Sequence, residues 1–117
     1  MFGLYEGKQA ILDSGCVYVV EGQLDVIKAH EKGFKNVVAL GSAAMTDYQF
    51  GMISRYTDSI FLLLDNDEAG SKGRESIHKK YGKLACIADM RLPSSYKDLD
   101  EYLLKNDCSF DEIEFQM

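Results

Sequence analysis

The sequence has few cysteines, a single proline and no long apolar segment. Its three cysteines, Cys16, Cys86 and Cys108, are odd in number and form no Cys-x-x-Cys pair, which argues against a zinc site or a disulfide scaffold. No stretch approaches the roughly 18 apolar residues that a membrane-spanning helix needs, and residues 1–6 lack the charged start and long apolar core of a signal peptide. These absences predict a protein with reduced thiols, no membrane segment and a cytoplasmic location.

Basic residues are scarce relative to acidic ones. Thirteen Lys and Arg residues stand against nineteen Asp and Glu residues, and the formal net charge is −6. This sign is wrong for a module that holds nucleic acid by neutralising phosphates alone, so such a partner requires a metal ion or help from elsewhere. The 117 residues, 46% of them hydrophobic, suffice for one domain that buries its own core. We expect it to be a monomer.

Apolar runs alternate with helical patterns along the chain. Strands are predicted at about residues 16–21, 37–40, 59–64 and 84–88, and helices at 2–12, 24–33, 46–56, 69–81 and 99–106. Thr46 is the predicted cap of the third helix. The order βαβαβαβ predicts an α/β fold with a mainly parallel four-stranded sheet, flanked by helices and joined by right-handed crossovers.

Acidic residues gather where two of the predicted strands end. Glu21 and Asp25 follow the first strand, Asp65 and Asp67 follow the third, and a further acidic cluster contains Asp98 and Asp100. Ligands of open α/β sheets bind outside the carboxyl ends of the strands, so we expect the carboxylates to converge there. Carboxylates held close together repel one another, and hard divalent cations relieve that repulsion. The sequence therefore predicts a Mg²⁺ or Mn²⁺ site for phosphate chemistry.

An EF-hand calcium loop is one alternative for the cluster around Asp65. Asp65, Asp67 and Gly70 have the spacing of its first, third and sixth positions. However, Ala69 cannot supply the fifth-position ligand, and Ser76 stands where a bidentate glutamate is required. The segment before Asp65 also has the pattern of a strand, so the sequence argues against an EF-hand.

Helix capping is another explanation for part of this cluster. Asp67 or Glu68 can cap the helix that is predicted to begin near Ala69, which leaves Asp65 for a metal ion.

The glycines of these motifs, Gly22 and Gly70, have two possible roles. Without a Cβ they allow a close approach to a phosphate or a metal-bound water, and they equally suit simple turn geometry.

The order of the motifs resembles the Toprim domain family shared by topoisomerases and primases, and within it the bacterial and phage primase branch. The resemblance covers roughly residues 2–105. The upstream segment Gly3-Leu4-Tyr5-Glu6 is similar to the one that leads into the Toprim domain of bacterial-type primases. The matching motifs are Glu21-Gly22-x-x-Asp25, Leu40-Gly41-Ser42-Ala43, Asp65-x-Asp67-x-Ala69-Gly70 and Asp98-x-Asp100.

This resemblance implies a role in the synthesis of short RNA primers during DNA replication. It implies that Glu21 acts near the reacting groups, as a metal ligand or in proton handling, and that Asp25 orders the loop. The metal ligands would be Glu21, Asp65, Asp67, Asp98 and Asp100, supported by a loop that contains Gly22, Gly41, Ser42 and Gly70. The implied partners are nucleoside triphosphates, a single-stranded DNA template and, through other parts of a parent protein, the replicative helicase.

Two features depart from the family pattern. Many relatives carry a basic residue where this chain has Ser71, and Lys72 and Arg74 are close enough to substitute in part as phosphate or nucleic-acid contacts. The chain also has no room for the zinc-binding, template-gripping and helicase-binding parts of such primases. We therefore expect a lead-in helical segment at residues 1–13, a Toprim domain at 14–106, and the start of further sequence at 107–117.

Two other functions use a similar pattern. A Toprim-type nuclease would use the same acids to hydrolyse phosphodiesters. A phospho-accepting receiver domain has a similar length and an acidic pocket, but it requires paired acids after the first strand, a lone Asp after the third and a fifth strand that ends in Lys, and this sequence offers none of these. The lone histidines His30 and His78 are assigned to surface or packing roles. The helical aromatic residues Tyr48, Phe50 and Tyr56 could stack on bases, but their spacing favours packing in the core.

Overall fold

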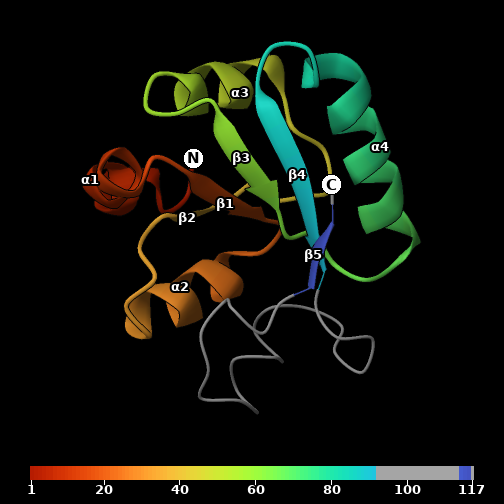
Figure 1. The fold of residues 1–117 in the computed structure, drawn as a ribbon. Coiled ribbons are helices and arrows are strands. Elements are labelled where there is room, and N and C mark those ends of the chain that lie inside the picture. The colour runs from red at the N-terminus through yellow and green to blue at the C-terminus, as the bar shows by residue number, and fades with distance from the viewer. Residues whose placement is uncertain (92–113, 117) are drawn as a thin grey trace.

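The computed structural model describes residues 1–91 and 114–116. Helices and strands alternate through most of this part of the chain (Figure 1). The elements, in chain order, are α1 (Leu4–Ser14), β1 (Val17–Val20), α2 (Gln23–Glu31), β2 (Val37–Ala39), α3 (Asp47–Ser54), β3 (Ser59–Leu62), α4 (Glu68–Tyr81), β4 (Cys86–Arg91) and β5 (Glu114–Gln116). Across these residues, no helix has the length and apolar character needed to cross a membrane.

The strands form one sheet with the order β2-β1-β3-β4-β5. Strands β1 to β4 pair in parallel, which confirms the predicted α/β fold with a mainly parallel four-stranded core. Strand β5 adds a fifth, antiparallel member at the β4 edge, with Phe115 opposite Met90. This strand was not predicted, because three residues are too few for an alternating pattern and only their pairing with β4 identifies them.

Most element boundaries differ from the predicted ones by a few residues, and two of these differences have a clear structural cause. The fourth strand was expected at 84–88 but runs over Cys86–Arg91. Leu84 is 69% exposed and its N–H bonds to the carbonyl of Tyr81, so it belongs to the turn after α4. The first helix begins at Leu4, because the carbonyl of Phe2 instead accepts a hydrogen bond from the N–H of Ala39 beside the sheet. The helix expected at 99–106 lies outside the described residues.

The core occupies both faces of the sheet. Alternate residues of β1 point to opposite sides: Val17 and Val19 join one buried cluster, and Val20 joins the other. The first cluster packs under α1, α3 and α4, and the second packs under α2. Parallel strands buried on two faces require continuous apolar runs, which is why these strands were readable in the sequence.

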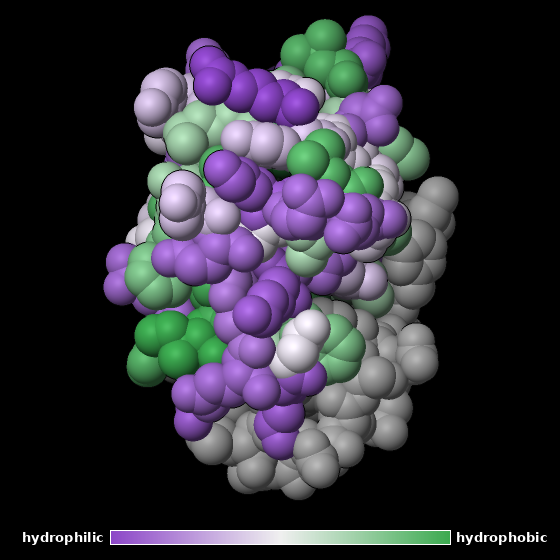
Figure 2. Space-filling view, turned by 90° about the vertical axis from the view of Figure 1, so that its left-hand side faces the viewer, coloured by the Kyte–Doolittle hydropathy of each residue, from purple (hydrophilic) through white to green (hydrophobic). Residues whose placement is uncertain are grey.

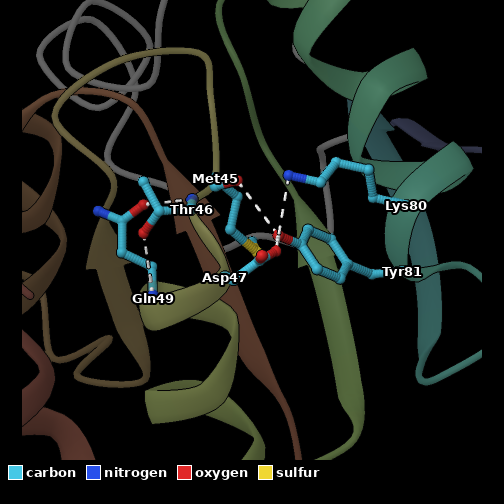
Figure 3. A network of polar contacts seen from close by, with 6 residues as sticks. All are labelled: Met45, Thr46, Asp47, Gln49, Lys80 and Tyr81. Atoms are coloured by element: carbon cyan, nitrogen blue, oxygen red, sulfur yellow. Dashed lines mark hydrogen bonds and ion pairs between the residues drawn. The ribbon is translucent and has the colours of Figure 1, made fainter.

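Helices α3 and α4 are joined by a buried tyrosine (Figure 3). Tyr81, near the end of α4, is only 4% exposed, and its hydroxyl donates a hydrogen bond to the carboxylate of Asp47 at the start of α3. Its ring stacks on Phe50, with the ring centroids 4.2 Å apart. The ammonium group of Lys80 lies 3.6 Å from the same carboxylate. The hydrogen bond from Tyr81, reinforced by the Lys80 charge, lowers the pKa of Asp47.

The helical aromatic residues do not share one role. Phe50 and Tyr56 pack partly buried against the core, as expected. Tyr48 is 75% exposed, so the packing role assigned to it was wrong. Ile53, the buried residue of α3, lies five positions after Tyr48 and so on another side of a regular helix, whereas Met52, four positions after Tyr48, is only partly buried. The near-helical spacing in the sequence did not distinguish these sides.

Replacing Tyr81 with Phe tests the connection between α3 and α4. We expect the free energy of unfolding at neutral pH to fall by about 1 kcal/mol or less, because a partly buried hydrogen bond is lost while the ring stays. The contribution of Asp47 is present above its unfolded pKa of about 4 and is lost as the pH falls through its lower folded value, so the wild-type advantage should shrink progressively as the pH falls below about 5. Urea unfolding at several pH values measures both effects.

Tyr48→Phe is the matched control, because it removes a hydroxyl from an exposed tyrosine of α3. It should leave stability unchanged at every pH. A Tyr81→Phe variant as stable as wild type at neutral pH would show that the hydroxyl of Tyr81 does not stabilise the contact between α3 and α4.

Candidate functional site

Two carboxylate residues meet at the carboxyl edge of the sheet. Glu21 directly follows β1, and Asp65 follows the apolar run that contains β3. These strands are parallel neighbours, with Val19 opposite Leu62. Oε2 of Glu21 accepts a hydrogen bond of 2.7 Å from the backbone N–H of Asp65. Glu21 and Asp65 therefore converge at one edge, as the strand pattern predicted.

A pocket of about 410 Å³ lies beside this pair. It is built by the end of β1, the first turn of α2, the loop after β2 and the residue that follows the β3 run. Six of its residues were predicted from the sequence, whereas Gln23 and Leu24 were not, because they occupy the unspecified positions of the Glu-Gly-x-x-Asp motif. The lining residues are Glu21, Gly22, Gln23, Leu24, Asp25, Gly41, Ser42 and Asp65.

Asp25 lies in helix α2, whereas the resemblance suggested that it orders a loop. It is the third residue of the helix and is only 5% exposed. Gly22 precedes the helix, and a Cβ at this position would lie 3.4 Å from Oδ2 of Asp25. A carboxylate in the first turn also interacts favourably with the helix dipole. Asp25 thus places a carboxyl group at the pocket, close to Gly22.

The loop after β2 forms another wall of the pocket. Gly41 has a φ of +89°, a conformation that favours glycine. Its N–H donates a 2.8 Å hydrogen bond to the carbonyl of Glu21. The hydroxyl of the next residue, Ser42, accepts a hydrogen bond from the N–H of Ala44. This wall is therefore linked directly to the backbone of the candidate catalytic glutamate.

Asp67 and Gly70 have structural contacts that the sequence left open. Asp67 caps helix α4, and its Oδ1 accepts a 2.7 Å hydrogen bond from the N–H of Gly70, as the capping alternative proposed. It lines a different depression, together with Glu68, Ala69 and Lys72. A Cβ on Gly70 would lie 2.0 Å from the carbonyl oxygen of Asp65. Gly70 is thus required for close packing of α4 on the backbone of Asp65.

The two candidate phosphate contacts on α4 differ in accessibility. Arg74 is only 3% exposed, and its guanidinium donates to the carbonyl of Leu64 and the hydroxyl of Ser71. Arg74 is therefore not accessible for the phosphate or nucleic-acid contact expected of it, because the helix turns this position toward the core. Lys72 is exposed as expected, and its ammonium group pairs with Glu68 at 3.2 Å.

The pocket lining carries oxygen groups of the kind that a hard divalent cation prefers, but the described residues do not form a complete metal site. Glu21, Asp25 and Asp65 supply carboxylate oxygens, the ligands that Mg²⁺ and Mn²⁺ prefer. In the described part of the chain, no group of three or more His, Cys, Asp or Glu side chains is arranged closely enough to hold a metal ion. The predicted ligands Asp98 and Asp100 lie outside that part.

The fold and the pocket define an α/β domain with an acidic site at the carboxyl edge of a mainly parallel sheet. A family model described as Toprim-like matches residues 18–103, well over half of the chain. The protein therefore belongs to the Toprim-like family, as its motif order indicated.

Its relatives with assigned functions include bacterial DNA primases. The DNA primase of Aquifex aeolicus is 38% identical over 104 residues, which are 88% of this chain but only 21% of that relative. The chain thus spans about a fifth of the length of this relative.

Solved primase structures share the fold. The zinc-binding and RNA polymerase domains of the Aquifex aeolicus primase match with a TM-score of 0.79 at 34% identity, over 91% of this chain and 26% of theirs. A primase catalytic domain solved with bound single-stranded DNA matches with a TM-score of 0.75 at 25% identity, over 89% of this chain and 34% of its own.

Gly70→Ala tests the close contact that holds α4 against Asp65. The added Cβ has no room beside a backbone carbonyl, so we expect the free energy of unfolding to fall by about 1–3 kcal/mol. Gly51→Ala is the matched control, because nothing lies within 4 Å of a Cβ at this position of α3. It should gain about 0.5–1 kcal/mol from helix propensity. Urea unfolding measures the stability of both variants, and equal changes in the two would contradict the close contact between Gly70 and Asp65.

Proposed function

We propose that this protein is the catalytic, metal-binding Toprim domain of a DNA primase. It would support Mg²⁺- or Mn²⁺-dependent nucleotidyl transfer in the synthesis of RNA primers for DNA replication. The observation that carries the proposal is the pair formed by Glu21 and Asp65, which face one pocket at the carboxyl edge of a Toprim-like sheet. The similarity to bacterial DNA primases supports this activity over other Toprim chemistries.

Glu21 and Asp65 would hold the cation, together with Asp98 and Asp100. Asp67, whose Oδ1 caps α4, would have only its second carboxylate oxygen to offer. A bound Mg²⁺ ion supplies charge neutralisation on a triphosphate and polarises its phosphoryl oxygens. The hydrogen bond from the N–H of Asp65 restricts the rotamer of Glu21 and keeps its carboxylate at the pocket. Glu21 is thereby oriented either to bind the cation or to accept a proton from an attacking hydroxyl group.

The template and the nucleotides would be held mainly by other parts of a larger protein. The net charge of −6 provides little attraction for phosphates, and Lys72 is the accessible one of the two predicted basic contacts. The proposed partners are single-stranded DNA, as in the related catalytic domain solved with it, nucleoside triphosphates and the replicative helicase. We expect the 117-residue chain alone to synthesise few primers, and we place it in the cytoplasm.

Asp65→Asn tests the proposed metal site in the isolated chain. Removing this charge should weaken Mn²⁺ binding by at least about tenfold, because even residues that only support metal ligands contribute about 10–100-fold. The backbone N–H that holds Glu21 remains in this variant. Mn²⁺ titration of ¹⁵N-labelled protein, with Mg²⁺ as competitor, should broaden the amide signals of residues 21–25 and 65–67 selectively in the wild type.

Asp58→Asn is the matched control, because Asp58 precedes β3 at the opposite end of the same strand. It should bind Mn²⁺ like the wild type. Scattered broadening, or equal affinity in Asp65→Asn and wild type, would overturn the metal site. Mg²⁺-dependent cleavage of a DNA or RNA strand that Asp65→Asn abolishes would instead support the Toprim-type nuclease.

A further inference from the structure

One side chain outside the pocket bridges the two ends of the loop that forms a wall of the pocket. The loop comprises residues 41–45, between β2 and the cap of α3. The side-chain amide of Gln49 donates a 3.0 Å hydrogen bond to the carbonyl of Leu40, just before this loop. The same amide accepts a 3.0 Å hydrogen bond from the N–H of Thr46, just after it. Gln49 therefore bridges both ends of the loop.

The bridge acts on the peptide group that contacts Glu21. The carbonyl of Leu40 and the N–H of Gly41 belong to one peptide unit, which is planar and rigid. The side chain of Gln49 binds the carbonyl of this peptide unit, and the N–H of the same unit donates the 2.8 Å hydrogen bond to the carbonyl of Glu21. Turning this peptide breaks both bonds together. The orientation of the wall beside Glu21 is thus coupled to the amide of Gln49.

Helix α3, which carries Gln49, is itself held in place, so the position of the Gln49 backbone is fixed. The hydroxyl of Thr46 caps the helix by accepting the N–H of Gln49, which completes a capping box (Figure 3). The next residue, Asp47, is bound by Tyr81 and Lys80 of α4. Helix α4 also contacts the loop, since a Cβ on Gly73 would lie 2.1 Å from the carbonyl oxygen of Ala43.

We infer that Gln49 is a positioning residue of the candidate active site. It holds the Leu40–Gly41 peptide, and with it the wall formed by Gly41 and Ser42, in the orientation that supports Glu21. This inference rests on the proposed function for its effect on metal binding, but not for its effect on the loop. Groups that orient metal ligands through hydrogen bonds change affinity without touching the ion.

Gln49→Met removes both hydrogen bonds of the side-chain amide while preserving its approximate length. Thr46→Ala is the control. It removes the capping hydroxyl, but both hydrogen bonds of the Gln49 side-chain amide remain possible, because the carbonyl of Leu40 and the backbone N–H of residue 46 are unchanged. Hydrogen exchange by NMR should show the amide of Gly41 exchanging about tenfold faster in Gln49→Met than in Thr46→Ala, through local opening. The Mn²⁺ affinity should fall about tenfold in Gln49→Met alone.

Gln49→Glu provides a second variant if Gln49→Met does not fold. It retains an acceptor for the N–H of Thr46 and loses the donor to Leu40. Its added negative charge attracts cations, so a weakened Mn²⁺ affinity would come from the lost hydrogen bond and support the inference. An affinity equal to or above that of the wild type would contradict it.

The two proposals can fail separately. Equal Gly41 exchange in Gln49→Met and Thr46→Ala, or an unchanged Mn²⁺ affinity in Gln49→Met, would overturn the positioning role. A wild-type chain that binds no Mn²⁺ would remove the metal site of the proposed function. The exchange rate of the Gly41 amide would then decide by itself whether Gln49 positions the wall.

Discussion

The parallel pairing of β1 with β3 is the constraint on which the rest of the site depends. Parallel neighbours end at the same edge, so the residues after them are brought together. The N–H of Leu63 bonds to the carbonyl of Val19, and two residues further on the N–H of Asp65 bonds to the side chain of Glu21. A carboxylate thus takes the place of a backbone acceptor where the strands separate, and both acidic residues are held at one opening.

Helix α4 connects this edge to the opposite wall of the pocket. It approaches Asp65 at Gly70 and the carbonyl of Ala43 at Gly73, at distances that leave no space for a Cβ. At its far end, Tyr81 binds Asp47 at the start of α3. The same helix therefore contacts the carboxylate edge, the wall loop and the helix that carries the bridging glutamine. Displacement of α4 would disturb all three, so its packing matters for the site as well as for stability.

Sequence patterns predicted the architecture better than the contacts within it. Continuous apolar runs identify the buried parallel strands, and the residues after them include Glu21 and Asp65. The same reasoning offered Arg74 as a phosphate or nucleic-acid contact, although its guanidinium is buried against the carbonyl of Leu64. Thr46 was predicted as a cap, and the Thr-x-x-Gln spacing was a signal for Gln49 that was not used. The hydrogen bond from Gln49 to Leu40 has no signal in the local sequence.

The sequence by itself determined the order of helices and strands and the end of the sheet at which Glu21 and Asp65 lie. These features follow from local properties, namely the burial pattern of each run and the turn that ends it. Only the tertiary structure decided that Asp67 caps a helix, that the β5 segment pairs with β4, and that Gln49 reaches Leu40. Each of these depends on which backbone group lies within hydrogen-bonding distance once the chain is packed, and one-dimensional patterns do not contain that distance.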